Sequence, residues 1–446
     1  MAEIIFKRKI YDRLLAWKQE SNGDTAMLVQ GARRVGKSTI VEEFARNEYK
    51  SYILIDFSKV SEEIKNLFEN LTDLNFIFLR LQAIYKVDLH ERQSVIIFDE
   101  VQHAPKARQA IKHLVKDHRY DYIETGSLIS IKKNVKDIVI PSEEEKLNMY
   151  PMDYEEFRWA MGDSVTIPLL KQFFDQKRPL GNAVHRQEMR NFRLYMLVGG
   201  MPQAVAQYIK TNNLSKVDTV KRRIIKLYEE DFRKIDDSEV MSNMFDSIPN
   251  QLTSNAQRYL RPQNLKEERT EKIVRRIPDM AASMTVNIAR HADDPFVGLA
   301  MNTNLNAFKL FLSDTGLFVT LAFMDKDVTE NIIYEKLLSD KLSANMGYVY
   351  ENVVSQMLVV KGDRLFYHTF PTESGKHNYE VDFILSRGNK ICPIEVKSSG
   401  YKTHASLDAF CNKYSSRVGD KYLIYTKDMA HDKDITCLPV YMTMFI

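Results

Sequence analysis

Cysteine and tryptophan are scarce in this chain of 446 residues, which contains three cysteines and two tryptophans. The cysteines are Cys392, Cys411 and Cys437, and they show neither a Cys-x-x-Cys spacing nor a nearby pair of histidines. An odd and sparse set of this kind excludes a disulfide framework and a zinc site. It is typical of free, buried thiols in a reducing cytosol.

Long apolar runs and an excess of charge of one sign are also lacking. No stretch of about 18 apolar residues occurs, so the sequence predicts no membrane-spanning helix. The first residues carry charge where a signal peptide needs an apolar stretch, and we therefore expect a cytoplasmic protein with no membrane partner. The 63 basic and 60 acidic residues leave a net charge of +3. Any nucleic-acid surface must therefore be local.

The rest of the composition is that of a globular protein, with 44% hydrophobic and 28% charged residues. Short apolar runs alternate with helical stretches between residues 24 and 150, whereas residues 153–237 show helical patterns throughout. The alternation predicts an α/β fold in which helices cover both faces of a parallel sheet. The expected strands of this sheet are Ala26–Gln30, Tyr52–Asp56, Ser94–Asp99, Tyr122–Thr125 and Leu147–Tyr150.

The first of these strands leads into a segment that matches Gly-x-x-x-x-Gly-Lys-[Ser/Thr], the phosphate-binding loop called Walker A. Glycine allows successive backbone N–H groups to point inward, and the following helix N-terminus adds partial positive charge. Lys37 is expected to reach the β- and γ-phosphates of ATP, and the Ser38 hydroxyl to ligate Mg²⁺. The alternative is a glycine-containing turn with an incidental Lys-Ser pair. The expected nucleotide-binding residues are Gly31, Ala32, Arg33, Arg34, Val35, Gly36, Lys37, Ser38 and Thr39.

Two carboxylates end the apolar run that begins at Ser94, as expected of a Walker B strand. Ligands of open parallel sheets bind at the C-terminal ends of the strands, where Asp99 and Glu100 would lie. We expect Asp99 to hold Mg²⁺ and Glu100 to orient or deprotonate the attacking water. An isolated Asp-Glu pair is more often a solvated strand end. Its position one strand–helix unit after Lys37 favours the catalytic role.

A third polar element is Thr125-Gly126-Ser127, at the end of the next strand. A hydroxyl at this strand end is a candidate sensor of the γ-phosphate, with Ser127 slightly favoured over Thr125. The alternative is a turn formed by small polar residues.

These elements resemble prokaryotic AAA-like P-loop ATPases that carry a C-terminal restriction-endonuclease-like, PD-(D/E)xK, domain. The resemblance covers essentially the whole chain. It implies an ATPase core at 1–160, a helical lid at 161–237, a winged-helix-like domain at 238–335 and the nuclease-like α/β domain at 336–446. Besides the Walker A loop, the motifs that carry it are Phe98-Asp-Glu100, Thr125-Gly-Ser127, Tyr150-Pro-Met-Asp-Tyr-Glu-Glu-Phe157, Gly199-Gly-Met-Pro202, Leu312-Ser-Asp-Thr-Gly-Leu317 and Glu380-Val-Asp382.

The resemblance also implies a further nucleotide contact near Gly200 and Pro202. The alternative is a helix that ends at Gly199-Gly200, followed by a new helix that Pro202 opens. One departure concerns residues 141–146, where many relatives have a Gly-Arg pair able to face a neighbour's nucleotide. The segment here is acidic, Pro-Ser-Glu-Glu-Glu-Lys, which argues against an arginine finger at this place.

The C-terminal part carries the Asp…Glu-x-Lys pattern of metal-dependent nucleases in Asp382, Glu395 and Lys397. Alternation along two strands joined by a turn at residues 386–390 brings the two acidic faces together. The acids would hold Mg²⁺, and Lys397 would activate water or stabilise the phosphate. The resemblance adds Glu351 as a further metal ligand. Paired charges on a solvated strand face are the alternative.

We therefore expect an ATPase that couples its nucleotide state to a nuclease-like domain acting on DNA or RNA. The basic stretch from Arg258 to Arg276 suits contact with a phosphate backbone, and a solvated helical face explains it equally well. The rival hypothesis is an ATP-controlled switch or adaptor with an inactive C-terminal domain and a protein partner or self-association. A small-molecule kinase is a weaker third possibility.

Overall fold

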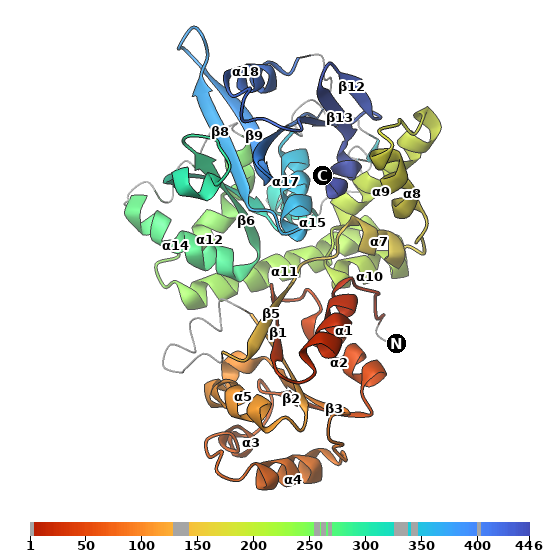
Figure 1. Ribbon diagram of the computed structural model, residues 1–446, viewed down its shortest axis with the longest axis vertical. Helices are drawn as coiled ribbons and strands as arrows, with labels where there is room; N and C mark the ends of the chain where they lie inside the picture. Colours follow the sequence, from red (N-terminus) through yellow and green to blue (C-terminus); the bar gives the residue numbers. More distant parts are fainter. Residues whose placement is uncertain are drawn as a thin grey trace. The chain divides into compact units, whose positions relative to one another are not determined.

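The computed structural model describes residues 4–127, 142–253, 259, 265, 270–324, 338–339, 347–398 and 403–446. The chain forms two compact units (Figure 1). The first unit comprises residues 1–150 together with the short segment 282–284. The second comprises residues 151–281 and 285–446. The four domain ranges given above are finer than this division and stay predictions.

The first unit is built on a five-stranded parallel sheet, as the alternating sequence pattern predicts. The order of the strands is β2-β3-β4-β1-β5, so β4 lies between the strand that leads into the phosphate loop and the strand that carries Asp99. Their ranges are β1 Ala26–Gly31, β2 Ser51–Asp56, β3 Ser94–Asp99, β4 Asp121–Gly126 and β5 Glu144–Met149.

Helices cover both faces of this sheet. Residues alternate between the two faces along each strand, and apolar residues occur on both faces. Ala26 and Leu28 of β1 belong to a buried apolar cluster that also contains residues of α4 and α5. Met27 and Val29, which alternate with them, are equally buried and lie on the opposite face. The helices of this unit are α1 Ile10–Ser21, α2 Lys37–Glu48, α3 Glu62–Asn66, α4 Leu74–Tyr85 and α5 Pro105–Asp117.

The second unit begins with helices, in agreement with the pattern of residues 153–237. A capping box opens α7, in which the Asp153 side chain accepts from the Glu156 N–H and the Glu156 side chain accepts from the Asp153 N–H. The helices up to the first strand are α7 Tyr154–Ala160, α8 Thr166–Asp175, α9 Asn182–Val198, α10 Pro202–Thr211, α11 Leu214–Ile235, α12 Val240–Asp246, α13 Ile248–Thr253 and α14 Thr270–Ser283.

A mixed eight-stranded sheet forms the remainder of this unit, in the order β12-β13-β11-β10-β9-β8-β6-β7. Because β6 pairs with β8, strands from residues 286–312 extend the sheet of the C-terminal strands instead of closing a sheet of their own. The winged-helix-like description of the middle region stays a prediction. The elements are β6 Val286–Ala292, β7 Thr303–Leu312, α15 Thr315–Ala322, α17 Gly347–Val360, β8 Leu365–Pro371, β9 Asn378–Arg387, β10 Lys390–Val396, α18 Ala405–Lys413, β11 Tyr422–Tyr425, β12 Ala430–Asp432 and β13 Ile435–Pro439.

Two of the family-like motifs pack against each other in the second unit. Gly199 ends α9 with a positive φ of 83°, and a Cβ on it would lie 3.0 Å from the Cα of Gly316. The Asp314 carboxylate accepts hydrogen bonds from the N–H groups of Gly200 and Leu317. The absence of side chains at these glycines therefore permits the close contact between α9 and α15.

A buried chain of hydrogen bonds connects the first residues of the second unit with α17. The Tyr195 hydroxyl donates to the Met152 carbonyl at 3.0 Å and accepts from Gln356 Nε2 at 2.8 Å. The Gln356 side-chain oxygen Oε1 in turn accepts from the N–H and hydroxyl of Thr315. Such a satisfied buried network favours one arrangement of the elements that it joins.

The three cysteines are free thiols buried in the second unit. Burial raises the pKa of Cys392 to about 12 and that of Cys411 and Cys437 to about 11. No helix within the described ranges has both the length and the apolar character needed to cross a membrane.

Candidate functional site

The phosphate loop connects β1 to α2 and has the backbone conformation that its glycines predict. Gly36 has a φ of 97° and precedes the first residue of α2, while Gly31 lies so close to β5 that a Cβ would be 2.3 Å from the Met149 carbonyl oxygen. Neither position tolerates a side chain without distortion. Arg33 and Arg34 are exposed at the tip of the loop.

Lys37 is buried at the start of α2, where its ammonium donates to the carbonyl oxygens of Gly31 and Ala32, each at 3.0 Å. Burial lowers the pKa of Lys37, and the nearby carboxylates of Glu100 and Asp99 oppose this shift. The ammonium therefore lies inside the loop, held by two oxygen atoms that an incoming phosphate can replace.

The Asp99 carboxylate lies at the end of β3 and joins all three predicted elements of the site. Its Oδ1 accepts a hydrogen bond from the Ser38 hydroxyl at 2.7 Å and another from the Thr125 hydroxyl. Burial raises the pKa of Asp99, while the hydrogen bonds from Thr125 and Ser38 counteract this effect. The serine hydroxyl and the carboxylate are hard oxygen donors of the kind that Mg²⁺ prefers, so this donor set fits the cation.

Glu100 follows β3 with a φ of 53°, the left-handed conformation that is uncommon for a residue with a side chain. Its N–H donates to the Thr125 hydroxyl at 3.3 Å, and its carboxylate accepts a hydrogen bond from Gln102 Nε2. Gln102 was not identified from the sequence. The signal available was its position two residues after Glu100.

Of the two sensor candidates, Thr125 is the one that contacts the acids. It is buried at the end of β4, and the strand order brings it between Lys37 and Asp99. Ser127, slightly favoured from the sequence, lies one residue beyond the end of the strand and is half-buried. Its assignment as the sensor stays a prediction.

Arg8 is a second residue that sequence analysis missed. Its guanidinium is buried and donates to the carbonyl oxygens of Val35, at 3.0 Å, and Tyr150, at 2.7 Å. It thus connects the segment before α1 with the phosphate loop and with the residue after β5. The basic start of the sequence was the only available signal, and it did not indicate a partner.

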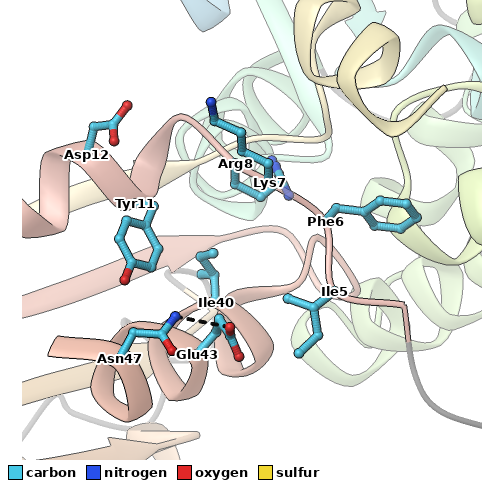
Figure 2. A pocket seen from close by; sticks show the side chains of 9 residues that line it. All are labelled: Ile5, Phe6, Lys7, Arg8, Tyr11, Asp12, Ile40, Glu43 and Asn47. Carbon is cyan, nitrogen blue, oxygen red and sulfur yellow. Dashed lines mark hydrogen bonds between the residues drawn. The ribbon is translucent and has the colours of Figure 1, made fainter. Parts of the chain in front are cut away.

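Arg8 also lines a pocket of about 340 Å³ beside α2 (Figure 2). Ile40, Glu43 and Asn47 lie on one face of α2 and form one wall, with a hydrogen bond of 3.0 Å from Asn47 Nδ2 to Glu43. The opposite wall comes from the N-terminal segment and the first turn of α1. The pocket therefore adjoins the phosphate loop at Val35 and contains both apolar and polar groups. Its remaining lining residues are Ile5, Phe6, Lys7, Tyr11 and Asp12.

In the second unit, the acids predicted to bind metal do lie close together. The antiparallel pairing of β9 and β10 places Phe383 opposite Ile394, and Asp382 and Glu395 follow next along this ladder. Asp382 is half-buried, as is Glu351 on α17, and the two carboxyl groups interact electrostatically. Burial raises the pKa of both carboxyl groups, and Glu351 further raises that of Asp382.

One oxygen of Asp382 and both oxygens of Glu395, however, already have other partners. Asp382 accepts from the Val396 N–H at 2.7 Å, and Glu395 accepts from the Leu407 N–H at 3.1 Å. Glu395 also pairs with the Lys397 ammonium at 2.6 Å. Within the part of the chain that the structure describes, no three His, Cys, Asp or Glu side chains are arranged to hold a metal ion. This donor set, as it is arranged, does not fit a divalent cation.

The other predicted residues lie in the second unit or outside the described ranges. Gly199 ends α9 and Pro202 opens α10, which is the alternative stated for this motif, and a nucleotide contact at Pro202 stays a prediction. In the basic stretch, Arg276 pairs with Asp236 at 2.6 Å and Arg275 with Glu271 at 2.5 Å. Arg258, Arg261, Lys266 and Arg269 lie outside the described residues.

Of the two units, the first has the more informative match to a protein family. Residues 23–158 match the profile of a family described as an AAA domain. Residues 189–328 and 346–442 match two families that are each described only as a domain of unknown function, DUF8612 and DUF4143. The chain therefore carries an AAA-like P-loop domain, and a restriction-endonuclease-like C-terminal domain stays a prediction. A search of curated proteins gave no match.

Solved structures show only distant similarity. A Walker-type ATPase of Pyrococcus abyssi is 15% identical, covers 71% of this chain and 96% of its own length, and has a TM-score of 0.39. The ORC1 protein of Aeropyrum pernix in complex with DNA is 11% identical and has a TM-score of 0.29. The match covers 76% of this chain and 94% of the ORC1 chain. A third structure is a signal transduction ATPase (STAND) protein with a tetratricopeptide repeat sensor, from Pyrococcus horikoshii. It is 10% identical and has a TM-score of 0.28, and the match covers 81% of this chain and 50% of that protein.

Proposed function

We propose that the chain binds and hydrolyses ATP at the loop between β1 and α2. The observation that carries this proposal is the Asp99 carboxylate, which accepts hydrogen bonds from Ser38 and Thr125. A helix start, a strand end and the strand between them thus supply polar groups to one point. Phosphoryl transfer to water needs such convergence, because positioning and charge stabilisation account for most of its catalysis.

The phosphates of ATP bind to the backbone N–H groups of residues 31–38 and to the N-terminus of α2. When they bind, the Lys37 ammonium exchanges the carbonyl oxygens of Gly31 and Ala32 for phosphate oxygens. Ser38 and Asp99 are the residues that would hold Mg²⁺, which supplies neutralisation of phosphate charge when bound. The mixed polar and apolar pocket beside α2 is our candidate for the base of the nucleotide, because Arg8 connects it with Val35.

Glu100 is the residue that we assign to the attacking water. Its carboxylate is held by Gln102, and its backbone N–H by Thr125, so the side chain is oriented before substrate arrives. A carboxylate near the γ-phosphate can accept a proton from water or orient it for attack. We do not favour the small-molecule kinase hypothesis. The pair Asp99 and Glu100 suits activation of water, and nothing in the sequence marks a pocket for a phosphate-accepting substrate.

Substitution of Lys37 and Glu100 tests this proposal. Lys37→Ala should abolish ATP binding, whereas Glu100→Gln should bind ATP with similar affinity and lose turnover by about 100-fold or more. Binding of a fluorescent ATP analogue and release of phosphate would be measured on the same preparations. Glu69→Gln, on an exposed glutamate of the first unit, is the control. Equal turnover in the wild type and the Glu100 variant would contradict the assigned role.

For the second unit, we favour the ATP-controlled switch or adaptor over the coupled nuclease. The support is chemical: Glu395 is bound by Lys397 and an N–H group, and Asp382 by another N–H group. The assignment of Glu351, Asp382 and Glu395 as Mg²⁺ ligands, with Lys397 as a catalytic residue, therefore stays the rival proposal. So does the binding of DNA or RNA.

A further inference from the structure

Lys309 is a charged residue inside the second unit that belongs to none of the motifs discussed so far. It lies on β7, and only 7% of its surface is exposed. Burial of an ammonium group is costly unless opposite charges and hydrogen bonds surround it. The identity of its neighbours therefore determines what this lysine does.

The acid that contacts Lys309 is Glu380 on β9, two residues before Asp382 of the nuclease-like pattern. The Lys309 ammonium forms an ion pair with Glu380 Oε1 and lies 5.4 Å from the centre of the buried Tyr367 ring, within the range of a cation–π interaction. Burial alone would lower the pKa of Lys309, but Glu380, Glu351 and Asp382, in that order, more than reverse the effect. The ion pair with Glu380 therefore offsets part of the cost of burying this ammonium.

The charges of the cluster show why an internal cation matters. Glu395 is neutralised by Lys397, at 2.6 Å, which leaves Glu351, Glu380 and Asp382 as three half-buried acids whose charges interact. Acids this close repel one another unless a cation lies among them or protons bind to them. In a metal-dependent nuclease that cation is a divalent metal ion, whereas here the Lys309 ammonium pairs with Glu380, which lies two residues before Asp382 on the same strand.

We propose that Lys309 is the built-in counter-ion of this acid cluster, so that the second unit keeps Glu351, Glu380 and Asp382 together without a divalent cation. The lysine comes from the region 189–328, whereas the acids come from 346–442, and these regions match two different family profiles. The ion pair thus stabilises the attachment of the β6–β7 hairpin to the C-terminal strands. This role does not depend on ATP hydrolysis in the first unit, so the two proposals can fail separately.

The first test compares metal binding by two full-length proteins without nucleotide. Isothermal titration with Mn²⁺, and separately with Mg²⁺, would be carried out on the wild type and on Asp382→Asn. We expect the two titrations to agree, because the wild-type cluster has no place for a metal ion. A Mn²⁺ site that is present in the wild type and lost in Asp382→Asn would overturn the proposal.

The second test removes the internal cation. Lys309→Met keeps the aliphatic stem but leaves the three acids without their counter-ion, so we expect Mn²⁺ affinity at least about tenfold higher than in the wild type and a melting temperature that Mn²⁺ raises. Lys309→Arg keeps the charge and should respond to Mn²⁺ as the wild type does. Lys421→Met is a matched control, because Lys421 pairs with the exposed Asp434 in the same unit.

Two results of the second test would count against the proposal. One is a folded Lys309→Met variant whose Mn²⁺ response equals that of the wild type. The other is an Arg variant that gains the same Mn²⁺ site as the Met variant. If Lys309→Met folds neither with nor without Mn²⁺, the comparison of the wild type with Asp382→Asn still decides the question.

Discussion

Thr125 illustrates how one hydroxyl group can connect the parts of a proposed catalytic site. It donates to Asp99 and accepts from the Glu100 N–H, so it fixes the carboxylate expected at the metal ion and the backbone of the residue expected at the water. A hydrogen bond to a charged group contributes about 1.5–3 kcal/mol, more than a bond between neutral groups. Loss of this hydroxyl should therefore lower the turnover number.

We predict that Thr125→Val lowers the turnover number by about tenfold or more, because the Asp99 carboxylate loses one of its two hydroxyl donors. Ser127→Ala should change turnover by less than about threefold, since that side chain lies beyond the strand end. Steady-state phosphate release at saturating ATP measures both. The opposite order of effects would restore Ser127 as the sensor that the sequence favoured.

His368 gives the second unit a dependence on pH. It is buried, with one ring nitrogen 2.7 Å from the Ala292 carbonyl oxygen and the other 3.0 Å from the Tyr414 hydroxyl. Burial lowers the pKa of His368 to about 4. The unfolded chain takes up a proton near the ordinary pKa of about 6.5, so protons favour the unfolded state between these two values.

The free energy of unfolding should accordingly fall by up to about 3 kcal/mol through His368 as the pH drops from 6.5 to 4. Urea unfolding, followed at intervals across this range, would measure the fall. His368→Gln should show a correspondingly smaller loss, whereas substitution of the exposed His431 should leave the profile unchanged. Identical profiles for the His368 variant and the wild type would show that the group does not titrate as described.

At the scale of elements, the contact between α9 and α15 depends on the absence of side chains. Gly200 donates its N–H to Asp314, and its carbonyl accepts from the Met152 N–H at 2.7 Å. A Cβ on Gly200 would lie 2.0 Å from the Met152 carbonyl oxygen, a distance that requires the backbone to move. This requirement gives the Gly-Gly-Met-Pro motif a structural role that holds whether or not it also contacts nucleotide.

Gly200→Ala should destabilise the second unit by about 2 kcal/mol or more, because the inserted methyl group displaces main-chain atoms. Gly347→Ala is the matched control, since among the described residues its Cβ would meet only the Ser398 hydroxyl, at 3.9 Å. Chemical denaturation of both variants provides the comparison. A Gly200 variant as stable as the Gly347 variant would exclude the steric role.

The elements of the first unit were largely predictable because each depends on local sequence. Ser94–Asp99 was predicted with its exact bounds, and the phosphate loop was located because its backbone geometry demands glycines at two fixed positions. Asp99 and Ser38 were both expected at Mg²⁺, and their contact agrees with the rule that ligands of open parallel sheets bind at the C-terminal ends of the strands.

Contacts between distant residues were not predictable in the same way. Periodicity indicates the face of a strand on which a residue lies, but not which distant residue it meets. Arg8 meets Val35 and Tyr150, and Lys309 meets Glu380, through tertiary packing alone. The acid pattern suggested a metal site for the same reason, since the lysine that faces it lies on a strand assigned to another domain.

At the scale of the whole molecule, the route of the chain from the first unit to the second is direct. Gly31 of the phosphate loop pairs with Met149, the last residue of β5. Three residues later, Met152 is bound by Gly200 and Tyr195, and Tyr195 is bound by Gln356 on α17. The backbone beside the nucleotide loop is therefore continuous with a buried network in the second unit.

A switch that uses this connection should respond to the γ-phosphate. We predict that hydrogen exchange of peptides from α9 and α17 differs by about fivefold or more between a non-hydrolysable ATP analogue and ADP, the scale of a coupling free energy of about 1 kcal/mol. Mass spectrometry would record it, and Lys37→Ala should abolish the difference. Identical exchange in both nucleotide states throughout the second unit would rule out nucleotide control.

The burial of the three thiols makes this molecule convenient for fluorescence work. Cys392, Cys411 and Cys437 are shielded and have raised pKa values, so they react slowly with maleimides, which attack the thiolate. The first unit contains no cysteine. Glu20→Cys and Lys210→Cys, on exposed positions of α1 and α10, would thus accept a donor and an acceptor dye without removal of any native cysteine. Energy transfer measured with and without ATP would report whether the distance between the two dyes responds to the nucleotide.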